Sequence, residues 1–183
     1  MSDILKPASV VALVGLILLA PSIQNLLSEE TLKYVEDSES AHAGLPSEWE
    51  DKQVLCVYFP IEQPHDQYSQ GVTMIDEGGE VMGVNGDLNR TGACVGGFDG
   101  FSSGLDFMMS STRLAGGALS VGYDVGQWGP FVHTIGGLNA DKLTGDFNGA
   151  YWSLNHNGVA SMVGIGDLIM SESDVITWSI ATW

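Results

Sequence analysis

Residues 151–160 read YWSLNHNGVA and contain the sharpest turn signal of the chain. Asn157-Gly158 favours a two-residue hairpin turn, because both central positions of a type I′ turn need a positive φ that Asn and Gly tolerate. Apolar and polar residues alternate on either side of this pair, as they do along a half-buried strand. The stretch therefore predicts two neighbouring antiparallel strands over residues 151–155 and 159–163.

From Gln53 onward, apolar and polar residues mostly alternate with the same period of two. Pro60 marks the edge or end of the first apolar run, because proline cannot donate to a strand ladder. Glu77-Gly78-Gly79 predicts a second hairpin. The further predicted strands cover residues 54–61, 72–75, 80–84, 118–123, 131–135 and 175–181.

One short segment has helical spacing instead. Leu105, Met108 and Met109 recur at intervals of three to four residues within residues 102–114. Ser102 or Ser103 is placed to cap the first turn, and Gly116-Gly117 favours the end of the helix. The fold class is therefore predicted to be α+β and mostly β, with strands around one short helix.

A series of aromatic and glycine motifs runs from residue 103 to the C-terminus. In chain order these are Ser103-Gly104-Leu105-Asp106, Gly129-Pro130-Phe131-Val132, Tyr151-Trp152, Asn157-Gly158, Val163-Gly164, Asp174-Val175-Ile176-Thr177-Trp178 and the closing Ala181-Thr182-Trp183. Over roughly residues 52–183 this spacing resembles the transcobalamin-like C-terminal domain family.

The resemblance implies a β-grasp-like fold, in which a mixed sheet wraps over one helix, and it implies no catalysis. In the vitamin B12 carriers of this family the domain covers one face of cobalamin, and other members are attached to cell-surface proteins. Ser173 stands where the family usually has glycine. A turn glycine with negative φ can be replaced, so this departure leaves the expected fold intact.

The charge of the chain is very uneven. Six Lys and Arg residues stand against 23 Asp and Glu residues, for a formal net charge of −17. Binding to nucleic-acid phosphates or to acidic lipid headgroups needs clustered basic side chains, so both are excluded as electrostatic partners. Because salt screens the repulsion among like charges, the composition favours a halophilic or marine source.

Residues 8–27 form the longest apolar segment, and residues 8–20, ASVVALVGLILLA, carry no charge. A helix of that length spans about 30 Å, which matches the hydrocarbon core of a bilayer. We expect three parts: a hydrophobic anchor helix over residues 1–27, which enters the membrane through residues 8–27, an acidic helix extension and linker over residues 28–51, and the β domain over residues 52–183.

Three interpretations of the apolar segment remain open: a retained signal anchor, which we favour, a cleaved signal peptide, and burial in a partner assembly. Residues 10–16, VVALVGL, together with Pro21, are also similar to type IV pilin helices. Lys6 precedes the segment and an acidic stretch follows it, which favours an N-terminus inside the cell and a body outside the cytoplasm.

Two further features bear on whether the β domain lies outside the cytoplasm. An even number of cysteines in a small extracytoplasmic domain favours a disulfide between Cys56 and Cys94, while two buried free thiols remain the alternative. Asn89-Arg90-Thr91 is a glycosylation sequon, so Asn89 is a candidate acceptor if the domain lies outside the cell.

Sequence patterns for catalysis and metal binding are missing. The four histidines lack metal-ligand spacing, and His156 in the NHNG turn is expected to be solvated. There is no GxSxG nucleophile motif, and residues 85–89 do not meet the twelve-residue calcium pattern. We therefore expect no enzyme activity, no cofactor and no metal site.

Aromatic side chains are the remaining candidates for contact with a ligand or partner. Trp128 in the GQWGP turn is the first candidate, with packing over the sheet edge as the alternative, and Phe131 and Tyr151 are the others. We favour a membrane-anchored surface module that binds a small ligand or a partner protein through its loops. The alternative is a structural subunit of a filament or a membrane-containing virion, with the N-terminal helix in lipid or in a helical core.

Overall fold

The computed structural model describes residues 40–86 and 88–183, and Ser40–Trp183 forms one compact unit. The predicted anchor over residues 8–27 and the pilin-like stretch lie outside the described residues. Within the described part of the chain, no helix combines the length and the apolar character needed to cross a membrane.

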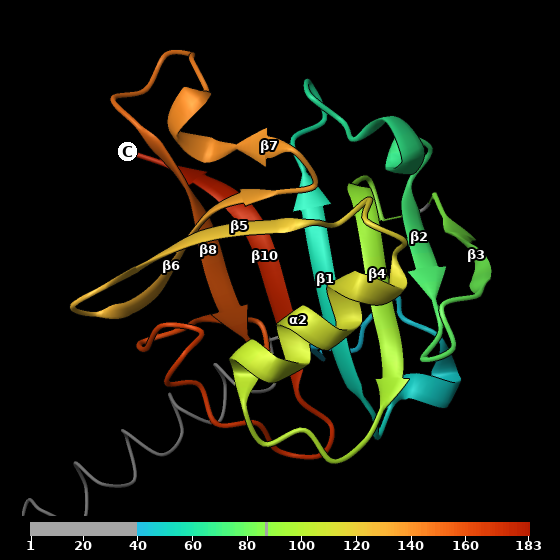
Figure 1. The fold of residues 1–183 in the computed structure, drawn as a ribbon. Helices are drawn as coiled ribbons and strands as arrows, with labels where there is room; N and C mark the ends of the chain where they lie inside the picture. The colour runs from blue at the N-terminus through green and yellow to red at the C-terminus, as the bar shows by residue number, and fades with distance from the viewer. Residues whose placement is uncertain (1–39, 87) are drawn as a thin grey trace, which may run out of the picture. The chain divides into compact units, whose positions relative to one another are not determined.

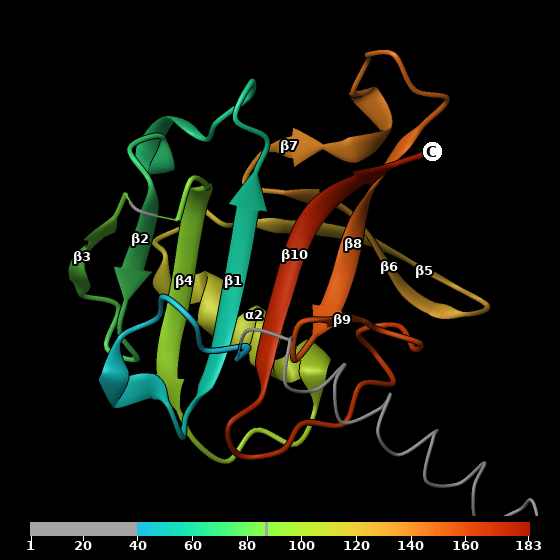
Figure 2. The same ribbon diagram turned by 180° about the vertical axis from the view of Figure 1, so that it is seen from behind.

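A mixed sheet forms the larger layer of the described unit (Figures 1 and 2). Its seven strands have the order β3-β2-β4-β1-β10-β8-β9. β1 pairs in parallel with β10 and antiparallel with β4, and β2 pairs in parallel with β4. The strands are β1 (Gln53–Phe59), β2 (Val72–Ile75), β3 (Val81–Asn85), β4 (Thr91–Phe98), β8 (Ala150–His156), β9 (Val159–Ala160) and β10 (Val175–Thr182).

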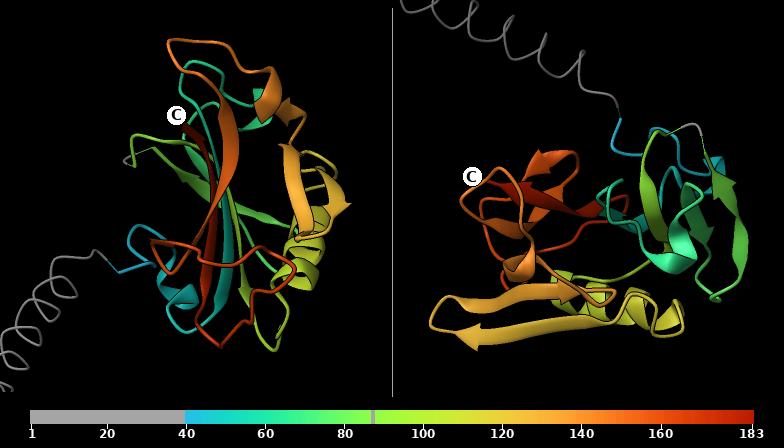
Figure 3. Two further views of the ribbon diagram at one scale, coloured as in Figure 1. Left: turned by 90° about the vertical axis from the view of Figure 1, so that its left-hand side faces the viewer. Right: turned by 90° about the horizontal axis from the view of Figure 1, so that it is seen from above.

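A second layer covers one face of this sheet (Figure 3, left). It consists of the helix α2 (Gly104–Leu114) and a smaller sheet of β5 (Val121–Gly126), β6 (Gly129–Ile135) and β7 (Leu138–Asn139). Short 3₁₀ turns are η1 (Ser47–Trp49), η2 (Asp66–Tyr68) and η3 (Ala140–Lys142). The main core lies between the layers and contains Phe107 and Met108 of α2, Leu55 and Val57 of β1, and Ile135 of β6.

The opposite face of the sheet has its own smaller core. Successive side chains of a strand point to opposite faces, so Val54 and Cys56 of the central strand β1 lie in this second core. Cys56 lies directly opposite Cys94 of β4, and the two form a disulfide, as predicted. Trp49, from the segment predicted to be a linker, is only 2% exposed. A Cβ on Gly96 would lie 2.6 Å from its ring, so this strand position needs glycine.

The predicted hairpin at Asn157-Gly158 is confirmed. Both residues have positive φ, 51° and 79°, and they join β8 to β9 in antiparallel pairing. The second strand is shorter than the predicted 159–163. Ser161 donates its backbone N–H to Leu154, and its hydroxyl donates to the carbonyl of Val163, so the chain turns after Ala160.

The fold class is also confirmed: a mostly β mixed sheet packs on one short helix. The cap prediction at Ser103 is correct, because its hydroxyl accepts a hydrogen bond from Asp106 N at 3.3 Å. The strand predicted over 118–123 is wrong at its start. Backbone hydrogen bonds from Ala118 to Ala115 and from Ser120 to Gly117 continue the turns after α2, so β5 begins at Val121.

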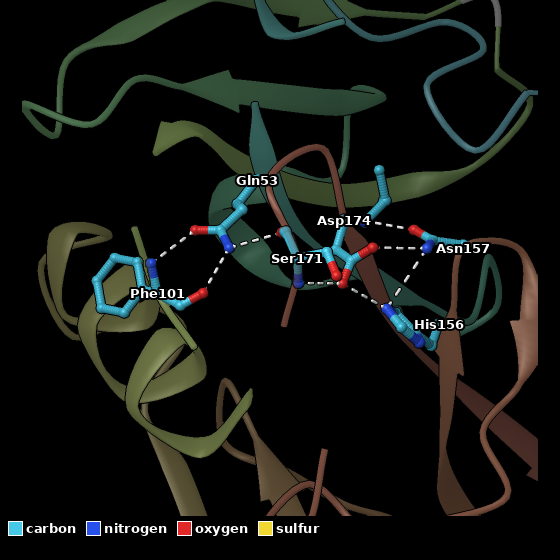
Figure 4. A network of polar contacts seen from close by, with 7 residues as sticks. Gln53, Phe101, His156, Asn157, Ser171 and Asp174 are labelled. Atoms are coloured by element: carbon cyan, nitrogen blue, oxygen red, sulfur yellow. Dashed lines mark hydrogen bonds and ion pairs between the residues drawn. The ribbon is translucent and has the colours of Figure 1, made fainter. Parts of the chain in front are cut away.

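Gln53, at the start of β1, is a polar side chain in the interior, with 1% exposure (Figure 4). Its Nε2 donates to the carbonyl oxygens of Phe101 at 2.7 Å and Ser171 at 2.8 Å, and its Oε1 accepts from Phe101 N at 3.1 Å. A buried amide must be hydrogen-bonded to be tolerated, and these bonds fix the segments that precede α2 and β10.

Asp174 is the second buried polar group of this network (Figure 4). Its carboxylate accepts hydrogen bonds from Ser171 N at 2.6 Å and Asn157 Nδ2 at 2.7 Å, and its Oδ2 lies 2.8 Å from His156 Nε2. Burial by itself raises the pKa of Asp174, but bonds from Asn157, Ser171 and His156 outweigh burial and lower the pKa below its ordinary value. His156, which we expected to be solvated, is half-buried against Asp174, with its side chain 28% exposed.

Candidate functional site

A cavity of about 430 Å³ opens where the parallel neighbours β1 and β10 end, toward the top of Figure 1. We call it the strand-end cavity. It is lined by Phe59, Pro60, Glu62, Gln63, Leu143, Thr144, Phe147, Ser179, Ile180 and Thr182.

Phe59 joins the lining of the strand-end cavity to the core. Pro60 ends β1, so Phe59 is the last side chain of that strand and is 5% exposed. The rings of Phe59 and Trp152 meet edge to face, with 5.8 Å between their centroids. Trp152 Nε1 in turn donates to the carbonyl of Leu138 at 3.1 Å. Trp152 does not line the cavity, but it packs against the Phe59 ring that does.

The outer wall is the loop over residues 143–147, which is fixed at both ends. On one side it follows η3, whose first turn is capped by Asn139 Oδ1, the acceptor for Asp141 N at 2.9 Å. On the other side Asn148 N donates to the carbonyl of Trp183 at 2.6 Å. Within the loop, the Phe147 ring lies so close to Gly145 that a Cβ there would overlap it. The ring therefore has a defined position.

The lining combines apolar side chains with a few uncharged polar groups. Phe59, Leu143, Phe147 and Ile180 supply the apolar surface. Hydroxyl and amide groups come from Gln63, Thr144, Ser179 and Thr182, and the ionisable lining residue is Glu62. Small-molecule sites are typically hollows of this size with an apolar lining and a few polar groups that orient the ligand. The arrangement suits the binding of a small molecule.

A smaller hollow of about 270 Å³ adjoins the strand-end cavity, because Phe59 and Gln63 line both. Its wall includes His65, whose ring lies 5.2 Å from that of Phe59 and 4.9 Å from that of Tyr68. His65 Nδ1 accepts a hydrogen bond from Gln67 N at 3.2 Å. Burial raises the pKa of the Tyr68 hydroxyl. Phe59 and His65 are the aromatic side chains that line the hollow, and Tyr68 packs against His65 behind them.

The predicted contact residues lie elsewhere and do not form one group. Trp128 and Phe131 belong to the β5–β6 hairpin and are 85% and 55% exposed. Tyr151 lies on β8 in the larger sheet, 40% exposed, with its ring 5.8 Å from that of Trp183. Asn89, the sequon residue, is exposed. Their roles in binding and glycosylation stay predictions.

The strand-end cavity was missed in the sequence because its lining comes from three separate segments. Two signals could have indicated it: the Phe59-Pro60 pair at the end of a strand, and Phe147 as an isolated aromatic in the polar loop LTGDFNG. Across residues 40–86 and 88–183, no cluster of three or more His, Cys, Asp or Glu side chains could hold a metal ion.

Two of the solved structures that match are similar to this chain at low identity. Haptocorrin in complex with Cbi has 18% identity and a TM-score of 0.37, covering 69% of this chain. This chain spans 25% of the haptocorrin chain. A protein from Ruminococcus gnavus, described as a candidate metal-binding protein, has 13% identity and a TM-score of 0.39 over 70% of this chain and 97% of its own.

The sequence matches none of the curated proteins. Over residues 115–182, from just after α2 to the end of β10, the chain is similar to a family described as a domain of unknown function, DUF4430.

Proposed function

We propose that this protein is a non-enzymatic, membrane-anchored module outside the cytoplasm, and that its β domain binds a small, uncharged, largely apolar ligand. The observation that carries this proposal is the strand-end cavity, whose lining includes the aromatic rings of Phe59 and Phe147 and the apolar side chains of Leu143 and Ile180. A preformed apolar hollow loses little conformational freedom when a ligand enters, so binding is favoured by the burial of apolar surface.

The charge of the site argues against an anionic ligand. Glu62 is the ionisable group of the lining, and the whole chain carries a net charge of −17. An anionic ligand would meet this negative potential without a basic lining group to balance it. A neutral ligand avoids that cost and can still use the Gln63 amide and the hydroxyls of Thr144 and Ser179.

The location rests on two observations. The Cys56–Cys94 disulfide is typical of proteins from oxidising compartments, and both cysteines are almost fully buried. The apolar residues 8–27 supply an anchor of the right length, with the domain on the far side of the membrane. Protease treatment of intact cells should therefore release the domain. Protection of the domain would contradict this location.

The binding proposal is tested with N-phenyl-1-naphthylamine, an uncharged apolar fluorophore, titrated into the full chain in detergent. The detergent alone serves as the blank. Phe147→Asp places a charge in the cavity wall and should weaken binding about tenfold or more. Val125→Asp introduces the same charge at a β5 position that is 75% exposed and outside the cavity lining, so it should leave binding unchanged.

Equal binding by the wild-type protein and the Phe147→Asp variant would overturn the proposal. Negative-stain images of the extracted protein give a second readout. Monodisperse particles agree with a surface module, whereas ordered polymers or lattices would support the structural-subunit class.

A further inference from the structure

The strand β3 forms one end of the larger sheet (Figures 1 and 2). It pairs antiparallel with β2 on one side, and no strand of the described residues pairs with its other side. Val81 is 64% exposed, Met82 is 43% exposed and Val84 is 53% exposed. Between them, a Cβ added at Gly83 would meet nothing within 4 Å. Residues 81–84 therefore present an uncharged and largely apolar edge, while Asn85 at the end of β3 donates its side-chain amide to the carbonyl of Gly44 at 3.0 Å.

Such an edge is unusual for a protein that acts alone. Sheet edges present backbone N–H and C=O groups to any passing strand, and natural proteins protect them with charges, prolines or very short strands. The opposite end of the same sheet follows this rule, because β9 has only two residues. β3 carries the sequence VMGVN, which has no charge and no proline, and its one irregularity is the register shift against β2 at Met82.

A groove of about 660 Å³ runs beside this edge. Its lining is Gly44, Leu45, Pro46, Glu48, Met74, Met82, Gly83, Val84, Asn85 and Gly86. Side chains of a strand alternate between the two faces of a sheet, so a strand added next to β3 would place every second side chain over this groove. Met74, Met82 and Leu45 supply apolar surface for those side chains.

Acidic groups surround the edge. Glu48 lies in the groove, and Asp76, Glu77 and Glu80 precede β3 in the turn from β2. A second copy of this chain brings a further net charge of −17 and no compensating basic cluster. A partner with basic side chains would be attracted to the same place. The backbone edge thus selects an extended segment, and the charges select a basic one.

We propose that β3 is a docking edge for an extended segment of a partner protein that carries alternating apolar and basic residues. The segment adds as a further strand next to β3, its apolar side chains occupy the groove at Met74 and Met82, and basic side chains at its ends lie near Glu48 and Glu80. Main-chain hydrogen bonds supply the affinity and the groove supplies the side-chain preference, as in other cases of strand addition.

The test uses a fluorescein-labelled peptide, KVTIKVK, titrated into the full chain in a neutral detergent and followed by fluorescence anisotropy. Two matched peptides accompany it. EVTIEVE reverses the charge, and a KVTIKVK peptide with N-methyl groups on alternate backbone amides cannot complete a strand ladder. Both should bind about tenfold more weakly or worse than KVTIKVK. Hydrogen exchange should show that the amides of residues 81–85 become protected by KVTIKVK.

The protein variants are Val84→Lys on β3 and Val159→Lys on β9, where both valines are exposed, at 53% and 69%. The first should lose binding and the second should keep it. Absence of KVTIKVK binding, or binding that Val84→Lys leaves unchanged, would overturn the proposal. It would also be overturned if the protein elutes as a dimer that Val84→Lys dissociates, because a second copy would then occupy the edge.

Discussion

Asn157 and Asp174 join the turn of the predicted hairpin to the start of the strand that closes the sheet. The Asn157 side-chain amide donates a 2.7 Å hydrogen bond to Asp174 Oδ1, and its oxygen accepts a 2.8 Å bond from the backbone N–H of Val175. The backbone N–H of Asn157 also donates to the carbonyl of Val175 at 2.8 Å. One residue thus shapes the turn through its φ of 51° and fixes β10 through its side chain.

These two roles of Asn157 can be separated by substitution. Asn157→Gly tolerates the positive φ but loses both side-chain bonds, so it should lower the free energy of unfolding by about 1–3 kcal/mol. Asn157→Ala also has to adopt the left-handed conformation and should cost about 1 kcal/mol more. Urea unfolding of the three proteins measures both steps. Equal stability of the two variants would show that φ contributes nothing here.

The carboxyl of Asp174 should make stability depend on pH in the acid range. Its pKa in the folded protein is lower than its ordinary value of 3.8, so folding favours the ionised form. The resulting stability is fully present above about pH 4 and is lost as the pH falls through the folded pKa. Urea unfolding across this range should show the loss in the wild-type protein and a flatter profile in Asp174→Asn.

Asp99→Asn is the matched control for this pH dependence. Asp99 also has a partner, Lys52 at 2.9 Å, but its side chain is 60% exposed. Exposed ion pairs contribute little, so this variant should keep the wild-type profile. A profile for Asp174→Asn as steep as that of the wild-type protein would assign the acid sensitivity to other groups.

Loss of the Cys56–Cys94 disulfide should destabilise the domain strongly. The two residues are 38 apart in sequence, and on the chain-entropy model closing such a loop stabilises the folded state by about 4 kcal/mol. Thermal and urea unfolding with and without dithiothreitol measure the effect. A double Cys56→Ala, Cys94→Ala variant should be destabilised and should not respond to the reductant. Stability of the wild-type protein that dithiothreitol leaves unchanged would contradict this prediction.

Trp49 should contribute to stability although it precedes the first strand. Its ring fills the second core next to Gly96, so Trp49→Ala should lower the free energy of unfolding by about 3–5 kcal/mol. Trp128→Ala removes an equal side chain that is 85% exposed and should change stability by about 0.5 kcal/mol or less. Urea unfolding compares the two. Similar effects at both positions would mean that Trp49 does not pack as described.

Shortened chains test the same packing. A chain that begins at residue 40 keeps Trp49 and should fold with its stability largely intact. A chain that begins at residue 53 lacks this side chain and exposes the second core on β1 and β4 to solvent. It should therefore unfold at lower urea concentration or aggregate. Soluble, equally stable products from both would contradict a structural role for residues 40–52.

Local signals in the sequence determined the types of element and several of their ends. Asn157-Gly158 forms a hairpin because the turn geometry depends on these two adjacent residues. Pro60 ends β1 because it lacks an N–H. Ser103 caps α2 because its hydroxyl reaches a backbone N–H in the first turn of the helix. Each of these outcomes depends on residues within one turn or one strand.

Only the tertiary structure decided which segments meet. The parallel pairing of β1 with β10 brings together strands from opposite ends of the described chain, and no short-range pattern specifies it. That pairing places Phe59 beside Ile180 and Phe147 in the strand-end cavity, and the same sheet order leaves β3 at an edge. The tertiary structure also places His156, which we expected to be a solvated turn residue, next to Asp174. A binding site made from separate segments depends on how strands are ordered, and strand order is set by the packing of the whole core.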